Sequence, residues 1–205
     1  MTKALTSLYD SYEDGHAAAL ELSAAGIADG KISLLANNLE GRNNIKAHEG
    51  NEAEAGAEAG MAFGAIIGGG VGLLAGLGLM AIPGVWPVVA AGWLATAAAG
   101  AVGAGAVAGT AGGLIGAMIG NGLLAEEANV MAEGVRRGGT LVTVLVEPAQ
   151  LANAERIMRD HHMLDTKALA RGYKQAGWTK FDETAPALNA AELATERANR
   201  QSKHA

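Results

Sequence analysis

The residues best placed for ligand chemistry are two adjacent arginines followed by two glycines, Arg136-Arg137-Gly138-Gly139, and then Thr140. Two guanidinium groups beside flexible backbone amides can hold a phosphate or a lipid headgroup. The same pattern is also typical of a helix C-terminus, where basic side chains interact favourably with the helix dipole and a glycine ends the helix. Arg136 and Arg137 are therefore candidate contacts for an anion or a headgroup, with a helix end as the alternative.

Other reactive residue types lack the spacing that metal binding or catalysis needs. His161 and His162 are adjacent, so on a helix their side chains would point about 100° apart, and the chain has no cysteine. An acidic run predicts a solvated helix face rather than a calcium site, and it consists of Glu49, Glu52, Glu54 and Glu58. The glycines do not form a nucleotide-binding loop. We therefore expect no catalytic residues, no metal and no cofactor.

Glycines recur at every fourth position in a long uncharged segment. This spacing places them on one side of a helix, as a stripe almost free of side chains. Each glycine in a helix interior costs about 1 kcal/mol relative to alanine, and close approach of a second helix offsets that cost. The pattern predicts a glycine zipper that packs helices and drives oligomerisation. Its residues are Gly60, Gly64, Gly68, Gly72 and Gly76, and in a second stripe Gly100, Gly112, Gly116 and Gly120.

The segment that carries these glycines, from Ala59 to Ala125, contains no Asp, Glu, Lys or Arg, although 18% of the whole chain is charged. Residues 81–87 include two prolines and predict a turn, so we expect a helical hairpin with arms at 44–81 and 88–124. If both flanks join one sheet, the hairpin crosses a bilayer an even number of times or is buried in a homo-oligomer. Its length favours a bilayer. Its Gly and Ala content contributes little transfer free energy, so both environments stay open.

The flanks of the insertion have the patterns of an α/β sheet. A hydroxyl residue followed three positions later by an acid, Ser11 and Asp14, predicts the start of the first helix. The expected strands are 3–9, 31–36, 139–146 and 163–165, and the expected helices are 11–26, 126–137 and 148–161. The order βαβ…βαβ predicts an α+β fold, a split ferredoxin-like sandwich with the glycine-zipper hairpin inserted.

This organisation divides the chain into four parts. They are an N-terminal βαβ half at 1–43, the glycine-zipper hairpin at 44–125, a helix plus the C-terminal βαβ half at 126–167, and a tail or arm at 168–205. The last part lacks a broad apolar face, which favours a solvated tail. Its aromatic residues Tyr173, Trp178 and Phe181 favour instead an arm ordered by a neighbouring subunit.

Charge and composition exclude several classes of protein. The net charge of −6 argues against nucleic-acid binding, which usually needs a basic surface. The absence of cysteine excludes disulfides and is compatible with a reducing compartment. The first ten residues contain no long apolar run, so we expect no secretory signal.

Three segments of the chain resemble the bacterial general-stress (heat-induced stress) protein domain, in a form with a glycine-zipper insertion. They are residues 8–14 (LYDSYED), 32–38 (ISLLANN) and 132–142 (AEGVRRGGTLV). The resemblance implies stress-linked expression and no established catalytic residues, and it transfers no site.

These observations predict a non-enzymatic, self-assembling stress-type protein. We expect a homo-oligomer at a lipid bilayer, with the soluble domain in the cytoplasm and the zipper hairpin driving helix packing. The alternative is a soluble, cytoplasmic oligomeric binding module whose hairpins are buried in the oligomer core. Neither alternative involves nucleic acid.

Overall fold

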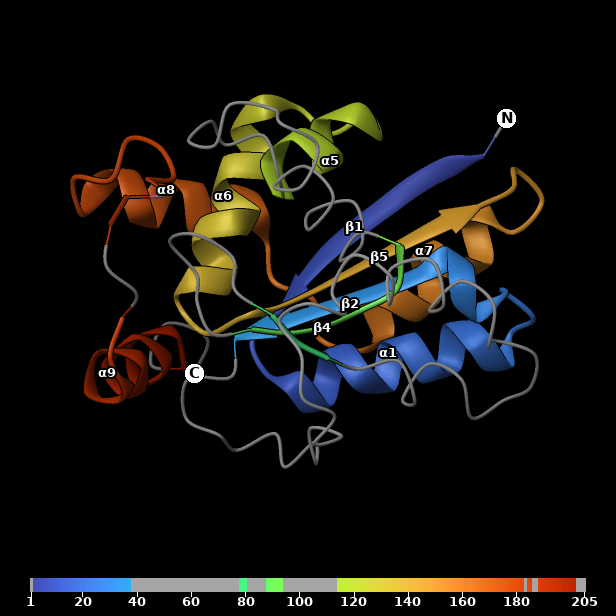
Figure 1. The fold of residues 1–205 in the computed structure, drawn as a ribbon, viewed down its shortest axis with the longest axis horizontal. Helices are drawn as coiled ribbons and strands as arrows, with labels where there is room; N and C mark the ends of the chain where they lie inside the picture. Colours follow the sequence, from blue (N-terminus) through green and yellow to red (C-terminus); the bar gives the residue numbers. More distant parts are fainter. Residues whose placement is uncertain are drawn as a thin grey trace.

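A computed structural model describes residues 2–37, 78–80, 88–93, 114–182, 184–185 and 188–201. Within them the protein is α+β, as predicted, with a sheet of order β1-β5-β2-β4-β3 in which every neighbouring pair is antiparallel (Figure 1). The strands are β1 Lys3–Tyr9, β2 Ile32–Asn37, β3 Gly78–Met80, β4 Val88–Ala91 and β5 Thr140–Val146. The helices are α1 Tyr12–Ala24, α5 Leu114–Gly120, α6 Ala125–Arg136, α7 Leu151–Asp160, α8 Thr166–Gln175 and α9 Ala190–Gln201, with a 3₁₀ turn η1 at Asp29–Lys31.

The N-terminal βαβ unit forms as its sequence predicts. The Ser11 hydroxyl caps α1 by accepting a hydrogen bond of 3.0 Å from the backbone N–H of Asp14. Beyond the end of α1, Gly26 takes a left-handed φ of +87°, which glycine adopts without steric cost. β1 and β2 do not pair with each other, because β5 lies between them and is antiparallel to both. The strand that joins β1 to β2 in the sheet therefore comes after the insertion in the sequence.

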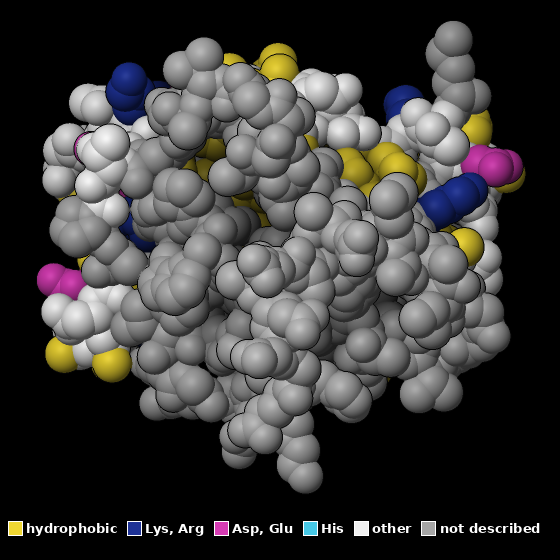
Figure 2. Space-filling view, in the orientation of Figure 1, with side chains coloured by type: hydrophobic (Ala, Val, Ile, Leu, Met, Phe, Trp, Pro, Cys, Tyr) yellow, Lys and Arg dark blue, Asp and Glu magenta, His cyan; other side chains and the backbone are white. Residues whose placement is uncertain are grey.

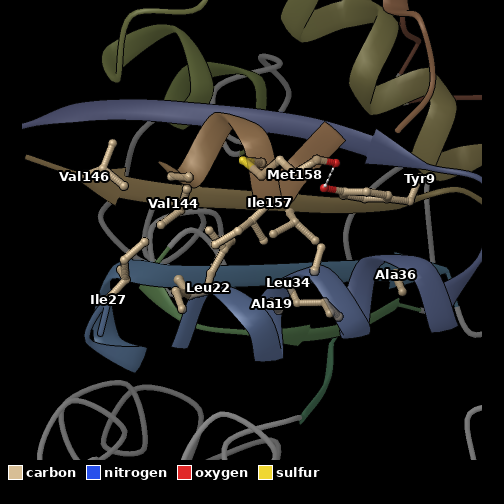
Figure 3. Packing of buried hydrophobic residues seen from close by; sticks show 14 residues of the cluster. Tyr9, Ala19, Leu22, Ile27, Leu34, Ala36, Val144, Val146, Ile157 and Met158 are labelled. Carbon is tan, nitrogen blue, oxygen red and sulfur yellow. Dashed lines mark hydrogen bonds between the residues drawn. The ribbon is translucent and has the colours of Figure 1, made fainter. Parts of the chain in front are cut away.

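One face of the sheet is covered by α1 and α7, which contact each other. Figure 3 shows the side chains that meet there, and it marks the hydrogen bond of 3.0 Å that the Tyr9 hydroxyl donates to the Met158 carbonyl. The buried residues of this cluster from α1, β2, β5 and α7 include Ala19, Leu22, Leu34, Val142, Val144, Ile157 and Met158. The opposite face is covered by α5 and α6, where Leu8, Leu35 and Leu141 of the sheet pack against Met118, Ala132 and Val135.

α1 approaches the sheet closely at Gly15. A Cβ added there would lie 2.5 Å from Thr140 Cγ2 and 3.4 Å from Val142 Cγ2. Both neighbours are β-branched side chains with little rotamer freedom. We expect Gly15→Ala to lower the free energy of unfolding by about 1–3 kcal/mol, because overpacking outweighs the gain in helix propensity. The control is Gly172→Ala in α8, where an added Cβ meets nothing within 4 Å. That variant should gain up to about 1 kcal/mol, and urea denaturation of both variants measures the difference.

The predicted helical hairpin is wrong at its centre. Gly78–Met80 and Val88–Ala91 lie at the ends of the predicted arms next to the turn, and they are strands, with β4 paired to β2 and β3 paired to β4. The β-branched Val88 and Val89 favour a strand, and β4 satisfies the backbone groups of β2 that would otherwise be unpaired. Of the zipper residues, Gly116 and Gly120 lie in α5. The other seven lie outside the described residues, and so does most of both arms.

The C-terminal region also differs from its prediction. The short strand expected at 163–165 is reduced to a single bridge between Met163 and Tyr9. Pro148 lies in the turn before α7 rather than in its first helical turn. The expected tail contains two helices of the same chain. α8 begins at an Asp165 cap and packs on α6, and α9 buries Leu193 completely.

Candidate functional site

The two predicted arginines lie at the C-terminal end of α6, around a buried carboxylate. Glu133 has a side chain that is 1% exposed. It accepts hydrogen bonds from Arg136 Nε at 2.9 Å and Nη2 at 2.7 Å, a bidentate pair. It also accepts one from Arg137 Nε at 2.6 Å. The (i, i+3) and (i, i+4) spacing places all three side chains on one side of the helix.

α9 contributes the other half of this cluster. Arg137 Nη1 donates to Glu196 at 2.7 Å. Arg200, which is 7% exposed, donates from Nε to Asp10 and from Nη1 to the Arg137 carbonyl at 3.0 Å. These contacts tie α9 to the end of α6 and to the junction between β1 and α1. Within the predicted solvated tail, α9 is therefore a helix whose Glu196 and Arg200 have partners elsewhere in the chain.

An aromatic residue of α8 completes the packing. The Arg137 guanidinium lies 4.5 Å from the centroid of the Tyr173 ring, and Trp178 meets this ring edge-on at 5.7 Å. Burial raises the pKa of Tyr173 to about 12, so the phenol is neutral at physiological pH. The hydrogen bonds that Arg136 donates to Glu133 raise the pKa of Arg136 above its usual value.

The ion-pair cluster is balanced in charge. It pairs three guanidinium groups with three carboxylates, those of Arg136, Arg137, Arg200, Asp10, Glu133 and Glu196. One donor of the cluster, Arg200 Nη2, is buried and has no hydrogen-bond partner among the described residues. A cationic cradle for an anion would need several donors that are not already committed to carboxylates. The geometry therefore supports the helix-end interpretation of Arg136 and Arg137, in which they position α9. Sequence reasoning missed Glu133, although its spacing to both arginines is a visible signal, and it missed Arg200, for which no local signal exists.

The turn after α6 explains the two glycines that follow the arginines. Gly138 has a φ of +92°, and a Cβ there would lie 3.3 Å from Leu193 Cδ2 of α9. A Cβ at Gly139 would lie 3.0 Å from the Gly134 carbonyl. Gly138 therefore ends α6 and allows α9 to approach closely, and Gly139 allows the backbone to pass close to the Gly134 carbonyl. At Gly120, one of the glycines of the predicted zipper, an added Cβ would in contrast meet nothing within 4 Å.

His161 and His162 each lie beside a single carboxylate. His161 Nε2 lies 2.7 Å from a carboxylate oxygen of Glu21, and His162 Nδ1 lies 3.9 Å from Asp14. In the part of the chain that the structure describes, no group of three or more His, Cys, Asp or Glu side chains could hold a metal ion. Within the same ranges, every helix is too short or too polar to cross a membrane.

Charge on the described surface is mixed. In the view of Figure 2 the coloured Lys, Arg, Asp and Glu side chains occur in small groups at the left and right margins, with both signs present. On this face the described side chains do not concentrate one sign of charge in a continuous patch.

No family model matches this chain, and neither the curated proteins nor the solved structures contain a significant match to it. The resemblance to the general-stress domain stays a prediction.

Proposed function

We propose that this protein is a non-enzymatic, stress-type self-assembly protein, in which the α+β domain holds two uncharged, small-residue segments against other copies of the chain. We further propose that the domain is a split ferredoxin-like sandwich. The spatial order from Met163 through β1 and β5 to β2 supports this, because in that topology the fourth strand lies beside the first and the third lies between the first and the second.

The observation that carries the proposal is that the uncharged segment returns to the sheet in its middle. β4 pairs with β2, and β3 pairs with β4. The insertion is thereby divided into residues 38–77 and 94–113, each bounded at both ends by elements of one domain. The uncharged part of the first segment, residues 59–77, would be about 28 Å long as a helix, enough for one bilayer crossing but not for a return.

This division favours packing in an oligomer core over a hairpin that spans a bilayer. A stripe of small residues allows the backbones of two helices to approach closely. Two copies of the chain can make this contact without either helix crossing a bilayer. Contact with a bilayer surface is the second environment that the proposal includes, and the experiment below separates the two.

The test is the double substitution Gly68→Leu with Gly72→Leu. Two leucines in the stripe should separate the helices, so we expect the particle mass measured by light scattering to fall by about twofold or more. The matched control is Gly30→Leu, at an exposed glycine where an added Cβ meets nothing within 4 Å.

Flotation with anionic lipid vesicles is measured on the same samples. Loss of mass without flotation in the native protein supports the oligomer core, and loss of flotation at constant mass supports the bilayer surface. If the double variant keeps both its mass and its flotation behaviour, the zipper does not drive assembly and the proposal is overturned.

A further inference from the structure

The outer edge of β1 is an open strand edge with a defined length. β1 pairs with β5 on its inner side through all seven residues from Lys3 to Tyr9. On its outer side, the contacts to described residues lie at one end, where Leu164 N–H donates to the Leu8 carbonyl at 2.7 Å and Met163 bridges Tyr9. The backbone edge is therefore open at residues 3–7, and the Ser7 hydroxyl donates to Met163 Sδ at 3.5 Å.

The Leu164 contact also fixes which backbone groups point outward. In an antiparallel strand the N–H and C=O of one residue point to the same side, and the side alternates along the chain. Because the Leu8 carbonyl points outward, the N–H and C=O of Thr6 and Ala4 do so too. Leu5 and Ser7 direct theirs at β5. None of these outward groups has a hydrogen bond to another described residue.

We propose that two copies of this chain pair through β1, antiparallel and in a two-fold arrangement centred on Leu5, so that two sheets become one. In this register Ala4 of each strand faces Thr6 of the other, and their outward N–H and C=O groups are in phase for four hydrogen bonds. Leu5 faces the partner's Leu5 as a non-hydrogen-bonded pair.

Side chains select this register. The open edge runs from residue 3 to residue 7, so its centre is Leu5, and a two-fold axis there pairs the whole edge with itself. Lys3 then faces the partner's Ser7. Moving the axis to Lys3 would oppose two lysines, which is unfavourable. Moving it to Thr6 would place Leu8 in the interface, where Leu164 already occupies the edge.

The edge also lacks the features that protect strand edges from pairing. β1 contains no proline, and its one charged residue is Lys3, at the first position of the strand. Ala4, Leu5 and Thr6 are partly buried, and Leu5 packs against the cluster between the sheet, α1 and α7. A self-complementary, unprotected edge of five residues fits a second copy of the same strand.

This interface uses none of the zipper glycines, so it can be tested independently of the zipper. The protein contains no cysteine, which makes a single introduced cysteine a clean probe. Across a non-hydrogen-bonded antiparallel pair the Cα atoms are about 4.5 Å apart, within the range that a disulfide bridges. On oxidation by diamide, two Leu5→Cys thiols each lose a proton and an electron and form one S–S bond.

We expect Leu5→Cys in the full-length chain to give mainly covalent dimer on a non-reducing gel. The control is Ser7→Cys, because two such cysteines would be separated by about 13 Å along the strands and should give at least about tenfold less dimer. The double variant Lys3→Cys with Ser7→Cys should cross-link again, since these positions face each other. If Leu5→Cys stays monomeric, or if it and Ser7→Cys cross-link equally, the two-fold interface is wrong.

A second substitution tests the backbone hydrogen bonds. Thr6→Pro in the Leu5→Cys chain removes the outward N–H without removing a backbone hydrogen bond to β5, and proline is tolerated on edge strands. It also removes the side-chain hydrogen bond of 3.1 Å between Thr6 Oγ1 and Thr143 Oγ1, so Thr6→Ala in the same chain is the matched control. We expect about tenfold less covalent dimer, with a far-UV circular dichroism spectrum like that of Leu5→Cys. Repeating the Leu5→Cys cross-link in the Gly68→Leu, Gly72→Leu chain separates the two proposals. A retained cross-link with reduced particle mass supports both interfaces, and a lost cross-link overturns the independence of the β1 interface.

Discussion

Replacing Glu133 by glutamine is expected to lower the free energy of unfolding by about 3 kcal/mol. The glutamine side chain fits the same space but carries no charge, so Arg136 and Arg137 lose the carboxylate that they share. Both guanidinium groups are only 14–15% exposed, and removing one partner of a buried pair leaves uncompensated charge away from water. Urea denaturation followed by circular dichroism measures the loss.

The control for this substitution is Glu155→Gln. Glu155 also lies one helical turn from an arginine, Arg159, but at 3.7 Å and with both side chains about half exposed. Exposed pairs contribute little, so the control should change the free energy of unfolding by less than about 0.5 kcal/mol. Equal, small effects of both substitutions would show that the ion-pair cluster does not hold α9 and α6 together.

Gly92→Ala is expected to be similarly damaging, by about 2–4 kcal/mol. Its φ is +86°, and an added Cβ would lie 2.1 Å from the Ile32 carbonyl oxygen and 2.7 Å from Ser33 Cα. Neither backbone atom can move without disturbing β2 and its pairing to β5. The cost therefore combines backbone strain with overpacking. The measurement is the midpoint and slope of urea denaturation.

A matched variant isolates the contribution of the backbone conformation. Gly122 also has a positive φ, of +100°, but an added Cβ there meets nothing within 4 Å. Gly122→Ala should cost about 1–2 kcal/mol. In the hairpin predicted from the sequence, Gly92 would lie inside a helix and alanine would stabilise it by about 1 kcal/mol. A stabilising Gly92→Ala would therefore contradict the pairing of β4 with β2.

Local patterns predicted the parts of the fold that depend on near neighbours. The β-branched run at 139–146 and the alternation at 3–9 correspond to β5 and β1 within one residue. Ser11 caps α1 as expected, and the acidic start and basic end of the segment 126–137 mark α6. Capping, strand propensity and the helix dipole act within a few residues, so these elements can be predicted from short stretches of the sequence.

Distant contacts were not predictable from the same patterns. β4 is a strand because β2 offers it a pairing edge. Val88 and Val89 favour a strand, but the small residues that follow them in the sequence suggest a helix. Arg200 is buried because Asp10, at the other end of the chain, accepts its hydrogen bond. The sequence predicted an anion contact for Arg136 and Arg137 because the partners of Arg137 are distant in the chain. Glu196 and Tyr173 contact Arg137 only when α8 and α9 fold back on α6.

The position of β5 between β1 and β2 sets the order in which the protein can fold. β1, α1 and β2 are synthesised first, yet the strand that joins them is not available until residues 38–139 have been translated. At ordinary elongation rates this takes about 5–20 s. While that segment is being synthesised, the six buried residues of β2 lack the strand that pairs with one of its two edges. We therefore expect the N-terminal βαβ unit to expose apolar surface on the nascent chain until residue 146 emerges from the ribosome.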